Sequence, residues 1–366
     1  MAASLLAGVA IGLTTVTGAT ERPTVRVGIV IDGPPGTDAP DSPGASRYGI
    51  LPQIIEETLA LTGREIDVRF PADKRAYGAW EAAAIRSGLG RLLADPEVDL
   101  VLTLGPFSSA EAVSRVRLEK PVVAPFVIDP DVENAPRDGN ASGVHNLAYV
   151  TLPLGIRDQL SRFREIVGFD RVHLVFDELI LEFLPEIPRR TLDIASSLGV
   201  EGVLVPLSDS PGPAADALPD GGQAVFLFPL PRFTREATRA LIEIANRKGI
   251  PTLACLSDDL LEDGALMSLA PEENLDRLAR RVALDIQRIL LGEEAGSLPV
   301  ALDQEERLQI NMETARRIGW YPTWETLIQA DLLNEETREA SLTWSLDGVA
   351  HEAVQANLDL LAQQRA

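Results

Sequence analysis

Three acidic side chains directly follow apolar stretches that have the composition of buried β-strands. Asp32 ends "VRVGIVID", Asp129 ends "PVVAPFVID" and Asp177 ends "RVHLVFD". Open α/β folds bind ligands outside the carboxyl ends of their strands, so these carboxylates could receive an ammonium group. Loop or helix-cap carboxylates are the alternative for all three, and we favour the ligand role for Asp32 and Asp129.

A turn followed by two serines offers a site of the opposite kind, one for an anion. The turn is Gly105, Pro106 and Phe107, and Ser108 and Ser109 open the next helical pattern. Backbone N–H groups at a helix N-terminus can bind a carboxylate, and serine hydroxyls can add to them. Ordinary N-capping explains the serines equally well. Phe107 is compatible with stacking on a ligand ring and with a core position.

These side chains belong to a repeated alternation of strand and helix patterns. Continuous apolar runs separated by amphipathic segments are typical of parallel sheets covered by helices. A loop rich in Asp, Pro, Gly and Asn at 129–143 interrupts the alternation, which then restarts, so two α/β lobes are expected. Strands are expected at 25–32, 65–70, 98–105, 121–129, 171–177, 200–207, 223–230 and 250–259, and helices at 48–63, 78–95, 108–119, 152–168, 184–199, 234–249 and 273–293.

Composition and missing motifs exclude several classes of function. The 366 residues carry a formal net charge of −22, which argues against nucleic-acid binding. Cys255 is the single cysteine, and its apolar surroundings favour a buried inert thiol. The histidines His145, His173 and His351 are far apart in the sequence, so no metal site is predicted. Phosphate-binding glycine loops and nucleophile elbows are absent, so we expect neither a cofactor nor an enzyme.

The first 20 residues have the features of a secretory signal. An apolar run at 5–13 is followed by the small residues Thr17, Gly18 and Ala19. An uncleaved membrane anchor is the alternative, although the run is short for a span of ~20 residues. We therefore expect export to the periplasm.

Five blocks of sequence carry a resemblance to a known family. They are "VDLVLTLGPFSSAEA" (98–112), "PVVAPFVIDP" (121–130), "GNASGV" (139–144), "GIPTLACLSDDLLEDGALMSLAPEENLDRLARRVALDIQRILLGE" (249–293) and "LQINMETARRIGW" (308–320). In order and spacing they resemble the solute-binding proteins of ABC importers of the tryptophan/tyrosine-type class, which share the type I periplasmic binding fold.

The resemblance implies two Rossmann-like lobes with parallel sheets that close on a small solute by a hinge motion. One lobe would comprise 24–143 with 257–292, and the other 144–256 with 293–333. Ser257 and Asp258 match family positions at the cleft edge, with hinge hydrogen bonding as their alternative role. The family's usual Gly-Thr-Pro-Ala-Ala-like turn is Gly105-Pro106-Phe107-Ser108-Ser109 here, so a tryptophan or tyrosine pocket is not assumed.

The expected function is therefore that of a periplasmic solute-binding protein that works with an ABC permease. Its candidate ligand residues are Asp32, Gly105, Phe107, Ser108, Ser109, Asp129, Asp177, Ser257 and Asp258. A non-transporting binding or interaction module of an export system is the alternative, because the turn and the loop after Asp32 depart from the family.

The C-terminal segment adds to that alternative. Residues 330–340 have the pattern of a polar helical connector, and 334–366 are expected to form a helical tail. "SLDGVAHEAVQANLDLLAQQRA" (345–366) is similar to the N-terminal entry segment of TolC-type outer-membrane efflux proteins. That resemblance implies a reading frame that continues into an efflux channel, with association to the outer membrane. A helix that docks on its own domain is the simpler alternative.

Overall fold

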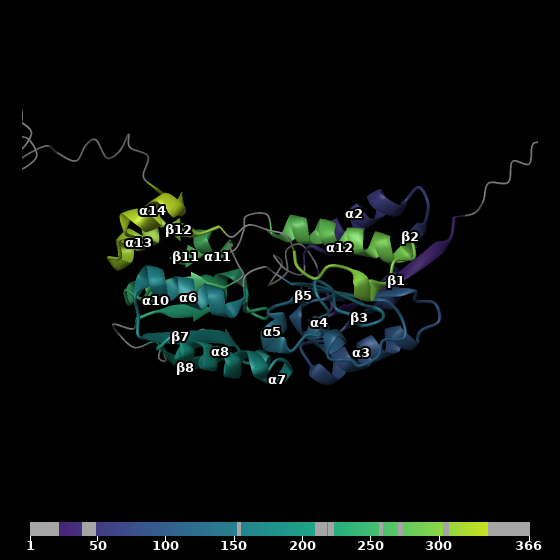
Figure 1. Ribbon diagram of the computed structural model, residues 1–366, viewed down its shortest axis with the longest axis horizontal. Coiled ribbons are helices and arrows are strands. Elements are labelled where there is room, and N and C mark those ends of the chain that lie inside the picture. Colours follow the sequence, from purple (N-terminus) through teal and green to yellow (C-terminus); the bar gives the residue numbers. More distant parts are fainter. Residues whose placement is uncertain are drawn as a thin grey trace, which may run out of the picture.

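The computed structural model describes residues 22–38, 49–151, 155–208, 218, 223–255, 259–269, 274–302 and 307–335. The predicted signal at 1–20, Ser257 and Asp258, and the TolC-like stretch from Ser345 lie outside the described residues. Two α/β lobes lie side by side along the long axis of the molecule (Figure 1). The fold class is therefore the expected one, with a separate sheet in each lobe.

The first lobe contains a parallel sheet. Its strands, in spatial order, are β2 (Asp67–Arg69), β1 (Thr24–Ile31), β4 (Leu100–Leu104), β5 (Val122–Val127) and β6 (Leu147–Thr151), and β3 (Arg75–Tyr77) pairs with the far end of β1. Every residue of β4, β5 and β6 is buried. This burial on both faces explains why these strands are continuous apolar runs instead of alternating patterns.

Helices cover both faces of this sheet. On one face α2 (Leu51–Thr62) packs with α12 (Asn274–Leu290), although more than 200 residues separate them, and Gln287 Nε2 donates to the carbonyl of Leu61 at 2.9 Å. On the other face lie α3 (Ala82–Ala94) and α4 (Pro106–Val113). The 3-10 turns η1 (Ala72–Lys74) and η2 (Ala295–Ser297) and the short α5 (Pro130–Glu133) complete the lobe.

The second lobe contains a larger mixed sheet. Its order is β13 (Asp331–Leu333), β12 (Gln309–Asn311), β11 (Met267–Ser268), β10 (Thr252–Ala254), β9 (Val225–Leu227), β7 (Arg171–Asp177) and β8 (Glu201–Leu207). Only the β11–β12 pairing is antiparallel among these strands. The helices of this lobe are α6 (Ile156–Val167), α7 (Leu179–Phe183), α8 (Glu186–Ser197), α10 (Arg235–Arg247), α11 (Asp259–Glu262), α13 (Met312–Ile318) and α14 (Trp324–Gln329).

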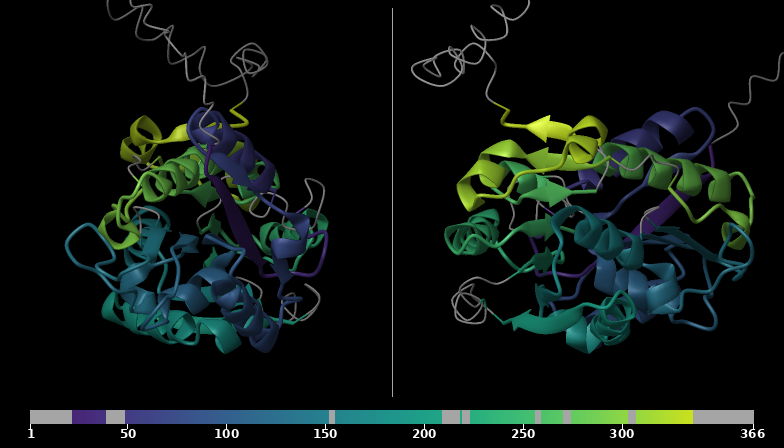
Figure 2. Two further views of the ribbon diagram at one scale, coloured as in Figure 1. Left: turned by 90° about the vertical axis from the view of Figure 1, so that its right-hand side faces the viewer. Right: turned by 60° about the vertical axis from the view of Figure 1, so that its left-hand side comes forward.

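Following the described segments, the chain changes lobe between β6 and α6, between β11 and α12, and between Leu302 and β12. Figures 1 and 2 show the result, with green α12 beside purple α2 and the yellow C-terminal elements on the teal lobe. These places differ from the sequence-based boundaries after 143, 256 and 292. The reason is that short segments complete the sheet edges: β6 pairs with β5, β11 pairs with β10, and Ala301 bridges to Thr151.

Two local expectations are also corrected. The predicted helical connector at 330–340 begins as strand β13, because Asp331–Leu333 pairs in parallel with β12. The helix expected at 108–119 begins at Pro106, so neither Ser108 nor Ser109 is its N-cap. Proline is well suited to the first helical position, where no N–H is needed.

The apolar core is continuous between the lobes. One cluster of buried side chains runs from the α3–α4 face of the first sheet through Phe107 and Val132 to Ile180 and Phe176 of the second lobe. Separate clusters lie under α2 and α12 and under α10. Within the described residues no helix has both the length and the apolar character that crossing a bilayer requires.

Candidate functional site

Asp32 lies at the carboxyl end of β1, and its side chain is fully buried. Its Oδ2 accepts a hydrogen bond of 2.9 Å from the N–H of Phe107, and its Oδ1 accepts one of 2.8 Å from the N–H of Ser108. Both donors belong to the first turn of α4, whose N–H groups have no partners inside the helix. The helix N-terminus that we considered for a ligand carboxylate is therefore filled by a carboxylate of the protein.

The two serines are also engaged within the first lobe. Ser108 Oγ donates to the carbonyl of Gly105 at 3.3 Å, and Ser109 Oγ lies 3.0 Å from Thr103 Oγ1 and accepts from the N–H of Phe126. Both serines are fully buried. Gly105 has a φ of 134°, a region that favours glycine, and this conformation lets the chain turn from β4 into α4.

Asp129 connects the N-termini of two helices that belong to different lobes. Its Oδ1 accepts from the N–H groups of Asp131 and Val132 in α5, and its Oδ2 accepts from the N–H of Ile156, the first residue of α6, at 2.9 Å. Asp129 follows β5 after one intervening residue, Ile128, so its carboxylate anchors the start of the second lobe to the edge of the first sheet. We call this contact the Asp129 bridge.

Asp177 ends β7, and its buried carboxylate is paired with Arg232. The Arg232 Nε lies 2.9 Å from Oδ1 and 3.0 Å from Oδ2, and Nη2 lies 2.6 Å from Oδ1. The N–H of Leu179 also donates to Oδ1. Asp177 is fully shielded from solvent, whereas the side chain of Arg232 is 17% exposed. The pair therefore presents its cationic member at the carboxyl edge of the second sheet.

The carboxyl edges of the two sheets meet at the boundary between the lobes. Phe107, which follows β4, stacks on Phe183 of α7, with ring centroids 4.4 Å apart and an interplanar angle of 26°. The Asp129 bridge joins the edge of β5 to α6 in the same region. Ligand sites of open α/β folds occur at such edges.

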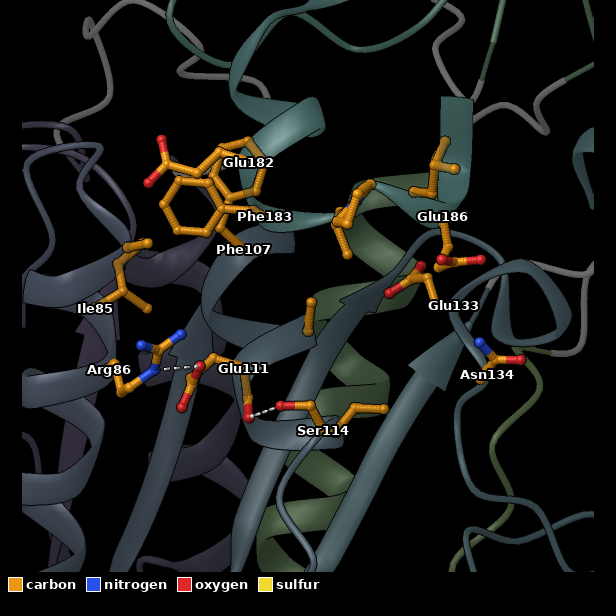
Figure 3. Close-up of a pocket in the computed structure, with 16 residues that line it drawn as sticks. Ile85, Arg86, Phe107, Glu111, Ser114, Glu133, Asn134, Glu182, Phe183 and Glu186 are labelled. Atoms are coloured by element: carbon orange, nitrogen blue, oxygen red, sulfur yellow. Dashed lines mark hydrogen bonds and ion pairs between the residues drawn. The ribbon is translucent and has the colours of Figure 1, made fainter. Parts of the chain in front are cut away.

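A cavity of about 240 Å³ lies beside the aromatic pair and is lined by both lobes (Figure 3). We call it the side cavity. Its lining includes Ile85, Arg86, Phe107, Glu111, Val113, Ser114, Glu133, Asn134, Glu182, Phe183, Glu186 and Ile187. Asp177 and Arg232 are not among its lining residues. A larger groove of about 640 Å³ lies between α5, α6 and α8.

Glu133 is the most perturbed acid of the side cavity. Burial raises the pKa of its carboxyl to about 7, although hydrogen bonds from the N–H groups of Asp129 and Ile128 act in the opposite direction. Both of those bonds go to Oε1, while Oε2 is buried without a hydrogen-bond partner. The carboxyl is thus poised between its neutral and ionised forms near neutral pH.

Cys255 and His145 were also considered from the sequence, and the structure gives each of them a structural role. Cys255 lies buried in the core, consistent with an inert thiol. His145 Nδ1 lies 3.1 Å from Glu294 Oε1, so it links two segments of the first lobe. In the described part of the chain, no group of His, Cys, Asp or Glu side chains is arranged to hold a metal ion.

The sequence reasoning missed Arg232, Glu133 and Phe183. Arg232 had the clearest signal, because it is a single cation in the apolar run "FPLPRF" immediately after a buried strand. Glu133 and Phe183 are brought to the lobe boundary by short helices that the sequence did not predict.

No protein-family model and no curated protein matches the chain. Several solved structures do match the chain. A conserved domain protein from Vibrio cholerae is 18% identical, with a TM-score of 0.61. The ABC domain from Streptococcus pneumonia in complex with L-Trp is 15% identical, with a TM-score of 0.61. A ligand-free, open substrate-binding protein with adhesive properties from Clostridium difficile is 14% identical, with a TM-score of 0.53. Each comparison covers 84% of this chain and 99% of the other.

Proposed function

We propose that this chain, which has the type I periplasmic binding protein fold, is an extracytoplasmic solute-binding protein of an ABC transport system. It would hold a small amino-acid-like or carboxylate ligand between its lobes. The observation that carries the proposal is the meeting of the two carboxyl edges, marked by the Phe107–Phe183 stack and the Asp129 bridge. The likeness in fold to a protein that binds L-Trp supports an amino-acid-like ligand.

In this proposal the sequence candidates have two different roles. Asp32, Gly105, Ser108, Ser109 and Asp129 shape the edge of the first lobe, because their polar groups are bonded within the protein. Arg232, held by Asp177 and partly exposed, attracts the ligand carboxylate by its charge, since its Nε and Nη2 are already bonded to Asp177. Ser257 and Asp258 follow β10 in the sequence and are proposed as further ligand contacts.

The partner would be an ABC permease, and the segment 1–20 would export the chain to the periplasm. The likeness to substrate-binding proteins, rather than to enzymes, supports a binding role without catalysis. Neither point depends on the identity of the solute.

A screen of the full chain tests the proposal. The L-amino acids and small carboxylates are added at millimolar concentration, and thermal unfolding is followed. A ligand at 100 times its Kd stabilises the folded state by about 2.7 kcal/mol, which gives a clear upward shift of Tm. Calorimetric titration should then give a single site that Arg232→Ala weakens at least about tenfold.

A matched control lies at the opposite end of β7, the strand whose last residue, Asp177, pairs with Arg232. Arg171 begins β7, is exposed and pairs with Glu201, so Arg171→Ala should leave the affinity unchanged. If no amino acid or carboxylate shifts Tm, the solute-binding proposal fails.

One observation favours a second candidate, a non-transporting binding or interaction module associated with an efflux channel. The carboxylates of Asp32, Asp129 and Asp177 are engaged with protein groups, and an apolar cluster joins the lobes. A module of this kind would keep its lobes closed without a solute. Small-angle scattering decides between the two: a solute-dependent decrease in the radius of gyration supports transport, and an invariant radius supports the module.

A further inference from the structure

The side cavity has an apolar wall and an acidic rim. The rings of Phe107 and Phe183 and the side chains of Ile85, Val113 and Ile187 supply the apolar surface of this open cavity, whose volume is about 240 Å³. Ligand clefts for drug-sized molecules measure ~300–1,000 Å³, so an occupant of this cavity would be smaller than most.

The charges around the side cavity are mainly negative. Glu111, Glu133, Glu182 and Glu186 line it together with a single arginine, Arg86. Glu111 is paired with Arg86 and Arg115, and Glu186 is paired with Arg189 and Arg190. The arginines therefore balance two of the four carboxyl groups.

Glu133 and Glu182 are the two carboxyl groups of the side cavity that no arginine in the described part of the chain balances. Glu182 is exposed at the mouth of the cavity, and the described residues supply no ion pair to it. Glu133 Oε1 accepts hydrogen bonds from the N–H groups of Ile128 and Asp129, and Oε2 is buried without a partner. A buried polar atom without a partner destabilises the folded protein, so a donor from a ligand would be favourable there.

The geometry distinguishes between kinds of cation. In the described part of the chain, acidic and imidazole groups are nowhere gathered closely enough to hold a metal ion. Figure 3 shows Glu133 and Glu186 on one side of the cavity and the aromatic pair with Glu182 on the other. Carboxyl groups set around apolar rings suit an ammonium group attached to an apolar body.

We propose that the side cavity binds a small organic ammonium ion whose amine donates to Glu133 Oε2 and whose apolar or aromatic group packs against Phe107 and Phe183. Glu182 adds longer-range attraction from the mouth of the cavity. This site is distinct from the proposed solute site at Arg232. Because its lining comes from both lobes, occupancy favours the closed arrangement.

Calorimetric titration of the full chain with 2-phenylethylamine at about pH 8 tests the proposal. 2-Phenylethanol is the neutral control, because it keeps the ring and loses the charge. The amine should bind, and the alcohol should bind at least about tenfold more weakly, because hydrogen bonds to charged groups are worth more than neutral ones. Equal affinity for amine and alcohol, or no binding of the amine at millimolar concentration, overturns the proposal.

Two variants locate the site. Glu133→Gln should weaken amine binding about tenfold or more, and Glu182→Gln up to about fivefold because it is exposed. Glu325→Gln, on exposed α14, is the matched control and should bind like the parent. Glu182→Gln changes only a surface group, so it keeps the test valid if Glu133→Gln does not fold. Unchanged affinity in both cavity variants contradicts the assignment.

The solute-site proposal and the side-cavity proposal can each be contradicted without the other. Arg232→Ala lies outside the side cavity and should keep its affinity for 2-phenylethylamine. Loss of amine binding in Arg232→Ala, with Glu182→Gln unaffected, assigns the amine to the solute cleft and overturns the second site.

Discussion

Asp32 Oδ1 accepts a hydrogen bond of 2.8 Å from the N–H of Ser108, a residue 76 positions later in the chain. The bond joins the end of β1 to the first turn of α4, the same helix terminus that looked suited to a ligand carboxylate. An anion from solution would have to displace a buried side chain that is already in place. The N–H groups of the turn after β4 are thus already satisfied within the protein, and the proposed ligand contact is Arg232 in the opposite lobe.

Removal of the Asp32 carboxylate should therefore destabilise the protein. Asp32→Ala leaves the N–H groups of Phe107 and Ser108 buried without their acceptor, and we expect a loss of about 2–3 kcal/mol in the free energy of unfolding. Urea denaturation at neutral pH measures it. Asp73→Asn changes an exposed aspartate of η1 and should stay within about 0.5 kcal/mol of the parent. A loss no larger than that of this control would contradict the capping role.

Asp177 and Arg232 should be strongly coupled in a double-mutant cycle. Arg232→Met leaves a fully buried carboxylate without its cation, at a cost of about 3–5 kcal/mol. Asp177→Asn with Arg232→Met removes both charges and should cost less than the sum of the single changes by about 1–3 kcal/mol. Additive effects in urea denaturation would show that the two charges do not depend on each other.

Glu133 should make stability fall as the pH rises. Its folded pKa of about 7 lies above the ordinary glutamate value of 4.5, so below about pH 4.5 the group is neutral in both states and contributes no penalty. Between these values the unfolded chain ionises first, and up to about 3 kcal/mol of stability is lost by pH 8. Glu133→Gln keeps an acceptor for the N–H groups of Ile128 and Asp129 but cannot ionise.

The measurement is the difference in unfolding free energy between parent and Glu133→Gln from about pH 5 to pH 8. Other acids titrate in both proteins and cancel in this difference. The variant should gain relative to the parent as the pH increases. A flat difference would mean that Glu133 ionises normally in the folded state.

The aromatic stack should help to hold the lobes together. Phe183→Ala removes the ring that packs on Phe107, and we expect a loss of about 2 kcal/mol together with a larger radius of gyration in small-angle scattering. Leu181→Ala removes a side chain of the same helix that is 44% exposed, and it should leave the radius unchanged. If both variants keep the parent's dimensions, the stack does not control closure.

The sequence predicted the repeated elements well, because burial on both faces produces an unmistakable pattern. "VDLVLTLG" and "PVVAPFVID" indicated β4 and β5, and the amphipathic run at 273–293 indicated α12. Strands of two or three residues, such as β3 and β11, escaped because they are too short to show a period. The omission of β11 displaced the second predicted lobe boundary.

The site was harder to predict than the fold because its groups meet through long-range pairing. Asp32, Asp129 and Asp177 were identified as strand-ending acids, and the structure places each at such an end. Their partners lie 75, 27 and 55 residues away, at Phe107, Ile156 and Arg232. A sequence pattern reports that a carboxylate is available at an edge, but only the packed lobes decide whether a backbone N–H or an arginine has already engaged it.

The position of α12 has a consequence for biosynthesis. This helix covers one face of the first sheet beside α2, yet the ribosome delivers it only after most of the second lobe. Until then Ile54 and its neighbours on that face have no cover, and domains normally fold as soon as their chain is complete. The nascent first lobe therefore exposes apolar surface until α12 is synthesised, which gives a chaperone a long interval in which to bind it.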